Sequence, residues 1–376
     1  MKLVALVLIV AACKGDETTS PVRAVAVKPS DARPVDADPR PVVVKPSTRC
    51  AECHGKMADE WGGSMHAQSN KSKLYLSLSA ADEQCAMCHA PLVAIAGADH
   101  PAAREGVTCD VCHTISKVDT DAPPPRFTLG VFDMIKYGPL CDAKDHYFHR
   151  MGCSKLHESA ELCGGCHQRV VPGPDGSVPL YTTYQEWKEG PYPDEGWQCQ
   201  DCHMPGVKAV VAEGEKVRAN VPDHGFFGGG DLRKDAAKLE LASRELDGGR
   251  VIDARLTNYA GHDLPSGFPG KRAVLRAVAL DRAGKELAKD EISIGRKLVD
   301  VRGAPTAYAN AARVQADDRL KPKEVRAVTL FSGQAIAGAA KVKADFVWQS
   351  IDPALAGPLG VAVDEKPIAH AEMKIK

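Results

Sequence analysis

Five copies of the pattern Cys-x-x-Cys-His dominate the chemistry open to this 376-residue chain. Each copy sets two thiols and one imidazole at a fixed short spacing, and the copies are Cys50–His54, Cys85–His89, Cys109–His113, Cys163–His167 and Cys199–His203. The pattern is typical of haem attachment, in which both thiols bond the porphyrin and the adjacent histidine becomes the proximal iron ligand. The sequence therefore predicts five covalently bound c-type haems.

The predicted attachment residues occupy the same positions in every copy. The thioether cysteines are Cys50, Cys53, Cys85, Cys88, Cys109, Cys112, Cys163, Cys166, Cys199 and Cys202, and the proximal ligands are His54, His89, His113, His167 and His203. Structural zinc sites and disulfides also use paired cysteines, but they do not require a histidine after the second cysteine in all five copies. A thioredoxin-like dithiol would occur once, at the start of a helix.

The first residues predict export. Met1-Lys2 is followed by an apolar run from Leu3 to Val10, and Val10-Ala-Ala-Cys13 matches a lipobox. We expect Cys13 to be lipidated and to anchor the protein to a membrane surface facing the periplasm or the cell exterior. Lys14 follows where inner-membrane lipoproteins often carry Asp, which favours the outer membrane. The alternative is an ordinary secretory signal that is cleaved nearby.

Composition divides the remainder of the chain into three parts. Residues 14–48 contain six prolines and eleven charged residues, so we expect a disordered tether. Residues 49–230 hold all five motifs, and residues 231–376 hold no cysteine. Aromatic residues make up only 5% of the chain. We therefore expect the porphyrins to supply much of the apolar mass of the middle part, which would be mainly α-helical and loop-rich.

Motif spacing and charge indicate what the middle part does and what it does not bind. Successive first cysteines are 35, 24, 54 and 36 residues apart, which places the haems close enough for electron transfer between them. The formal net charge is −1, and haem propionates would add about ten negative charges. An acidic holoprotein excludes nucleic acid as a favoured partner and points to redox proteins instead.

A resemblance to a known family enters at Trp61-Gly-Gly-Ser-Met-His66-Ala, which follows the first motif. Trp-x-x-Ser-x-His-Ala at this place resembles the tetrahaem cytochrome c554-type family and its multihaem relatives. Further matching segments cover about residues 49–270, and they are Arg104–His113, His157–His167, Tyr184–Trp187 and Trp197–Pro205. The resemblance implies that His66 is the distal ligand of a haem attached elsewhere in the chain.

Four more histidines are candidate distal ligands. The resemblance favours His149 and His157, eight residues apart and on one face if their segment is helical, with His146 as a competitor. It also favours His224, in Asp-His-Gly-Phe, and His262, in Gly-His-Asp-Leu-Pro-Ser266-Gly, where the family loop usually has Thr in place of Ser266. The default environment of His100 and His370 is solvent. Methionine is another natural axial ligand, but packing is its more common role.

Cys141 and Cys153 lie outside every haem motif. In an exported protein such a leftover pair predicts a disulfide, here one that braces the loop carrying His146 and His149. Two free buried thiols are the alternative.

Residues 231–376 have the alternation typical of β-strands. The expected strands are Lys238–Leu246, Val251–Leu256, Ala273–Leu280, Ile292–Val301, Glu324–Phe331, Lys341–Trp348 and Ile368–Ile375. Seven strands in this length predict an all-β, immunoglobulin-like sandwich.

The leading hypothesis is therefore a lipid-anchored cytochrome that relays electrons in anaerobic respiration, between partners such as a quinol-linked donor and a terminal reductase. The alternative is a reductase of nitrite, hydroxylamine or a similar small oxyanion at one open haem. Against it, no motif here is Cys-x-x-Cys-Lys, the form at the active haem of pentahaem nitrite reductases. A scaffold in which haems serve only docking is a third possibility.

Overall fold

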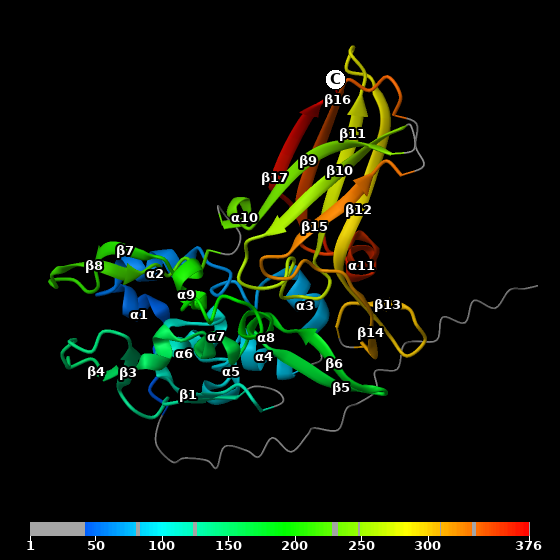
Figure 1. Cartoon of the computed structure of the whole chain (residues 1–376). Helices are drawn as coiled ribbons and strands as arrows, with labels where there is room; N and C mark the ends of the chain where they lie inside the picture. The colour runs from blue at the N-terminus through cyan, green and yellow to red at the C-terminus, as the bar shows by residue number, and fades with distance from the viewer. Residues whose placement is uncertain are drawn as a thin grey trace, which may run out of the picture. The chain divides into compact units, whose positions relative to one another are not determined.

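The computed structural model of the chain describes residues 42–79, 83–122, 126–227, 232–246, 249–308, 310–332 and 336–375. The predicted signal with Cys13 and the tether as far as residue 41 lie outside the described residues. Residues Val42–Lys376 form one compact unit. We call residues 42–227 the motif region and residues 237–375 the β region (Figure 1). Among the described helices, none has the length and hydropathy that crossing a membrane requires.

Short helices carry the motifs. The α-helices of the motif region are α1 (Ser47–Ala51), α2 (Gly55–Gly62), α3 (Lys73–Ser79), α4 (Glu83–His89), α5 (Val93–Ala96), α6 (Cys109–Thr114), α7 (Ala160–Gly164), α8 (Thr183–Lys188) and α9 (Cys199–His203), and the 3-10 helices are η1 (Pro101–Glu105) and η2 (Lys155–Glu158). A helical turn places residues three apart on one face, so it presents both thiols of a motif on the same side. Where α1 and α7 end, backbone bonds continue the turn, as from His54 N to Cys50 O at 2.8 Å.

Short strands between the motifs were not expected and add to the predicted helices and loops of this region. Four two-stranded sheets pair β1 (Ile115–Asp119) with β2 (Arg126–Leu129), β3 (Ile135–Gly138) with β4 (Arg150–Cys153), β5 (Arg169–Gly173) with β6 (Gly176–Tyr181), and β7 (Gly206–Val210) with β8 (Val217–Pro222). The connections between motifs satisfy their backbone groups by local pairing where no helix is available. His149 and His157 accordingly do not share a helix face, because β4 and η2 follow His149.

The predicted tether ends earlier than residue 48. Val44 is buried, and Val42 packs against the cluster formed by Leu92, Val111 and Val131. The backbone N–H groups of Lys45 and Ser47 also donate to Asp110 and Glu105. Residues 42–48 thus belong to the folded unit, because three consecutive valines supply apolar surface that composition averaged over residues 14–48 conceals.

The β region contains each of the seven predicted strands. Its elements are α10 (Leu232–Asp235, immediately before it), β9 (Ala237–Leu246), β10 (Gly249–Asn258), β11 (Arg272–Leu280), β12 (Glu286–Val299), β13 (Pro305–Thr306), β14 (Arg313–Asp317), β15 (Val325–Leu330), β16 (Lys341–Gln349), α11 (Pro353–Leu359) and β17 (Glu365–Lys374). Short β13, β14 and α11 were not predicted. One sheet has the order β15-β10-β9, and the other has β13-β12-β11-β16-β17 with β14 on β12.

The two sheets face each other across one apolar core. Ile252 and Leu256 from β10 meet Leu275 from β11 and Phe346 from β16, and each of these side chains is 0% exposed. All strand pairs in both sheets are antiparallel. The β region is therefore a two-sheet arrangement compatible with a sandwich, and its immunoglobulin-like class stays a prediction.

Candidate functional site

Tertiary packing brings thiols from different motifs close together. Cys50 and Cys109, Cys88 and Cys166, and Cys163 and Cys199 lie near enough to shift one another's pKa. Cys112 of the third motif is also close enough to act electrostatically on the two thiols of the fourth. The contacts link the first, third, fourth and fifth motifs in series, with the second motif attached to the fourth.

Four of the five proximal histidines face a predicted distal histidine. The ring centres are 6.3 Å apart for His54 and His149, 6.2 Å for His167 and His66, 6.3 Å for His113 and His224, and 6.3 Å for His203 and His262. A metal–nitrogen bond of about 2 Å, with the ring centre about 1 Å beyond it, puts two imidazoles on one metal about 6 Å apart. The four pairs therefore fit bis-histidine ligation of an iron.

Backbone carbonyls occupy the second nitrogen of many of these rings. The distances from Nδ1 to the carbonyl oxygen are 2.7 Å for His54 and Val211, 2.9 Å for His89 and Ser69, 2.6 Å for His113 and Tyr137, 2.5 Å for His203 and Phe227, 2.8 Å for His224 and Pro222, and 2.9 Å for His262 and Asp263. A metal-binding histidine usually donates its other N–H in this way, which fixes the ring and leaves Nε2 for the metal.

The charge state of the buried rings also suits metal binding. Burial lowers the pKa of His66 to about 4, and the neighbouring His203 and His89 add to the effect. Burial likewise lowers the pKa of both His113 and His167 to about 3. These imidazoles are neutral at neutral pH, which is the form that binds a metal.

His157 competes with His224 for the position facing His113. Its ring centre is 5.8 Å from that of His113, but its Nε2 lies 3.0 Å from the carbonyl oxygen of Cys112. The Nδ1 of His224, in contrast, is the nitrogen engaged by a carbonyl, so its Nε2 is available. The nitrogen geometry favours His224 over His157 as the partner of His113.

His89 of the second motif differs from the other four proximal histidines. Among the described residues, the ring in contact with it belongs to Tyr75, whose centre is 4.8 Å away, and no second imidazole takes that place. Two hydrogen bonds join Ser69 to this histidine. The Ser69 carbonyl accepts from His89 Nδ1, and the Ser69 hydroxyl donates to the His89 carbonyl at 2.6 Å. The sequence offered five candidate distal histidines for five haems and gave no signal for Tyr75.

The segment that carries His66 is held by the chain just before the third motif. Val107 N donates to His66 O at 3.1 Å, and Trp61 Nε1 donates to Val107 O at 2.8 Å. Gly106 has φ +81°, and a Cβ there would lie 2.5 Å from the His66 carbonyl oxygen. The close approach requires glycine, and it aims His66 at the fourth motif.

The remaining candidates have ordinary surroundings. His146 is exposed and exchanges backbone bonds with His149, His100 caps η1 by accepting from Ala102 N at 3.2 Å, and His370 pairs with Asp345 on the surface. Cys141 and Cys153 form the predicted disulfide, with Cα atoms 4.7 Å apart. The disulfide closes the loop that contains both His146 and His149.

Comparisons with known proteins bear on the family and the fold of the chain. The family model described as cytochrome c554 and c-prime matches residues 49–114. A crystal structure of a penta-heme cytochrome c552 from Thermochromatium tepidum superposes with a TM-score of 0.70, at 24% sequence identity, over 88% of this chain and 99% of that one. These findings support a multihaem c-type cytochrome. No curated protein matches the chain.

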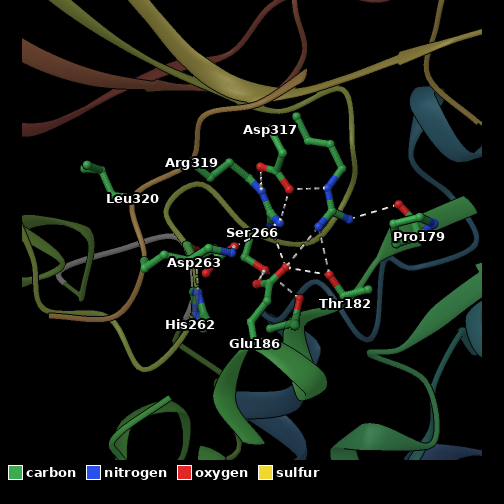
Figure 2. Close-up of polar contacts among 12 residues, drawn as sticks. Pro179, Thr182, Glu186, His262, Asp263, Ser266, Asp317, Arg319 and Leu320 are labelled. Carbon is green, nitrogen blue, oxygen red and sulfur yellow. Dashed lines mark hydrogen bonds and ion pairs between the residues drawn. The ribbon is translucent and has the colours of Figure 1, made fainter. Parts of the chain in front are cut away.

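Buried charges near His262 are a second set of residues that sequence reasoning missed. Glu186 of α8 and Arg319 and Asp263 of the β region form ion pairs close to this histidine (Figure 2). Their spacing in the sequence, 133 residues between Glu186 and Arg319, offers no local pattern by which to recognise them.

Proposed function

We propose that this protein is a lipid-anchored pentahaem c-type cytochrome that transfers electrons between membrane or periplasmic redox partners. The observation that carries the proposal is the set of four imidazole pairs at 6.2 to 6.3 Å, each combining a motif histidine with a histidine distant in sequence. The closeness of thiols from different motifs, which shift one another's pKa, supports close spacing of the attached groups.

The residues of the chain have distinct roles in this proposal. Ten motif cysteines hold the haems, which when bound supply iron centres that accept and release single electrons. The motif histidines would each supply one imidazole to an iron, and His66, His149, His224 and His262 would supply a second one at four of the five sites. Two neutral imidazoles at such a site would leave no place on the metal for water or substrate. Carbonyl partners at Nδ1 of His224 and His262 keep these two rings from turning and leave Nε2 for the metal.

Partners and location follow from the sequence as further parts of the proposal. Cys13 carries the lipid, residues 14–41 give reach from an outer membrane, and electrons pass between a quinol-linked donor and a terminal reductase. Labelled palmitate should enter the wild-type protein in a bacterial host, and Cys13→Ala should abolish its incorporation. Continued labelling of Cys13→Ala would contradict the anchor.

Redox stoichiometry tests the electron-transfer role most directly. A pyridine haemochrome assay should give five haems per protein, and a potentiometric titration should resolve about five electrons over a broad potential range, because ligands and burial differ between the sites. A single narrow transition of one electron per protein would contradict the proposal.

The environment of His89 supports a second candidate function. Since no imidazole faces His89 among the described residues, the haem at the second motif would have an open axial position next to Tyr75. An open position is what a reductase of nitrite or hydroxylamine needs. Electron paramagnetic resonance should then show a high-spin haem whose signal shifts when nitrite or hydroxylamine is added. If the signal of the open haem does not change with either compound, the reductase function is contradicted and electron transfer is the remaining candidate.

A further inference from the structure

A network of buried charges joins α8 of the motif region to the loop of the β region that carries His262 (Figure 2). Three carboxylates meet three cations there: Glu186, Asp263 and Asp317, with Arg296, Arg319 and Lys321. The Glu186 and Arg319 side chains are each 5% exposed, and that of Asp263 is 1% exposed. Buried charges are tolerated when they are paired, so these side chains constrain one another's positions.

Glu186 is the member of this set that the motif region contributes. Its Oε1 accepts hydrogen bonds from Arg319 Nη1 at 2.5 Å and from Thr182 Oγ1 at 2.8 Å. Its Oε2 accepts from the Ser266 hydroxyl at 2.5 Å, and that hydroxyl lies 2.8 Å from Thr183 Oγ1. Both carboxylate oxygens therefore hold side chains of the β region, and one of these, Ser266, is four residues after His262.

The loop around His262 is fastened on both sides. Asp263 Oδ2 lies 2.9 Å from Arg319 Nη2 and 2.8 Å from Lys321 Nζ. Asn258 Nδ2 donates to the His262 carbonyl at 3.0 Å. Leu264 and Leu320 exchange backbone hydrogen bonds of 2.9 and 3.0 Å. His262 cannot shift without breaking contacts that the ion pairs hold in place.

Helix α8 is in turn tied to the motifs that its charges face. Tyr184 N donates to the carbonyl of His167 in the fourth motif at 3.1 Å. Trp187 Nε1 donates to Trp197 O at 3.0 Å, two residues before Cys199 of the fifth motif. Glu186 is therefore fixed relative to the fourth and fifth motifs, and its ion pair and hydrogen bonds fix the His262 loop relative to the same motifs.

We infer that Glu186, Arg319 and Ser266 are positioning residues that keep His262 on the iron at the fifth motif, so that the β region caps this haem. The inference rests on the proposed function, in which His262 is the distal ligand opposite His203. Ser266 belongs to this set because its hydroxyl donates to Glu186 Oε2.

Apolar contacts hold the two regions together independently of this network. Val178 and Leu180 of β6 are buried against Leu298 of β12. Loss of the charge network should therefore release the His262 loop while the β region stays attached. The two effects are separable by experiment.

The test uses the haem-loaded full-length protein with Glu186→Ala. This change removes the contacts to Arg319 and Ser266, so we expect high-spin haem to rise by up to one per protein in electron paramagnetic resonance. Carbon monoxide binding should rise by the same amount, and hydrogen exchange should accelerate at residues 258–266. Glu186→Gln removes the charge and keeps one acceptor oxygen for Arg319, but its amide nitrogen can only donate, so Ser266 would have to accept; we expect an intermediate effect. Unchanged circular dichroism establishes that each variant folds.

Matched variants separate positioning from general damage. Ser266→Ala should raise the high-spin fraction, whereas Ser266→Thr, which retains the hydroxyl, should behave as the wild type. Glu195→Gln removes an exposed ion pair with Lys323 that also joins the two regions, and it should change nothing. An equal effect of Glu195→Gln would overturn the specific role of the buried network.

His262→Ala distinguishes failure of the inference from failure of the proposed function. If His262→Ala adds one high-spin haem and Glu186→Ala adds none, the positioning role is wrong and the ligand assignment stands. If His262→Ala also leaves the spin count unchanged, His262 is not the ligand, and the proposed set of axial pairs fails at this site together with the inference built on it.

Discussion

The motif region and the β region differ in how much of an apolar core their own side chains form. Eight of the twelve largest fully buried side chains among the described residues lie in the β region, and the other four are Leu92, Val111, Val131 and Leu180. The β region closes two sheets over this apolar core. The longer motif region has short helices, two-stranded sheets and imidazoles aimed at one another. The difference predicts that the fold of the motif region depends on bound haem and that the fold of the β region does not.

Preparing the protein without haem should have the largest effect on this comparison. The motif region would lose the apolar mass around which its short helices are arranged, because an isolated helix of this length is not stable in water. Hydrogen exchange should show fast exchange across α1–α9 and retained protection in β9–β12 and β15–β17. The haem-loaded protein is the control, and equal protection of the motif region in both forms would contradict the contrast.

Phe346→Ala should damage the β region selectively. The side chain is 0% exposed between the sheets, and deletion of a buried aromatic ring costs about 3–5 kcal/mol of unfolding free energy. Denaturation followed by strand circular dichroism should show the loss. Val325→Ala changes a residue that is 49% exposed on β15 and should cost less than about 0.5 kcal/mol. Similar losses in both variants would argue against a packed sandwich core.

Replacing both Cys141 and Cys153 by serine should affect the motif region alone. A disulfide that closes a loop of this length contributes about 2–3 kcal/mol, here to the loop that holds His149 opposite His54. We expect this loop to become sensitive to protease and the spin state of the first haem to become mixed, with the β region unchanged. Reduction of the wild-type disulfide should reproduce the result, and a resistant loop would show that haem alone holds it.

Acid should weaken the buried charge network of the β region to a smaller extent. Burial opposes ionisation of Asp317, but the hydrogen bond and charge of Arg319, together with the charge of Arg296, outweigh it and lower its pKa to about 2. A lowered pKa gives stability that is present above the ordinary value near 4 and is lost as pH falls through about 2. Unfolding between pH 5 and 2 should show a loss on the order of 1 kcal/mol from this group. Asp317→Asn should reduce the dependence of unfolding free energy on pH in this range. An unchanged dependence would show that Asp317 is not its source.

The haem-attachment motifs, the strands of the β region and the disulfide could all be predicted from local patterns in the sequence. Cys-x-x-Cys-His is a spacing within one helical turn, so the five motifs could be read without a structure. The strands of the β region follow from alternation over ten residues or fewer, and the structure contains all seven predicted ones. The Cys141–Cys153 disulfide followed from counting the cysteines left over.

Only the tertiary structure decided which histidine faces which motif. His66 meets His167 across a hundred residues of chain, and no spacing rule connects them. His224 rather than His157 offers its Nε2 to His113, and His89 faces Tyr75. The pairing of Glu186 with Arg319 has the same origin. Such contacts arise where separate elements pack, and their free energy depends on burial and geometry that no short stretch of sequence contains.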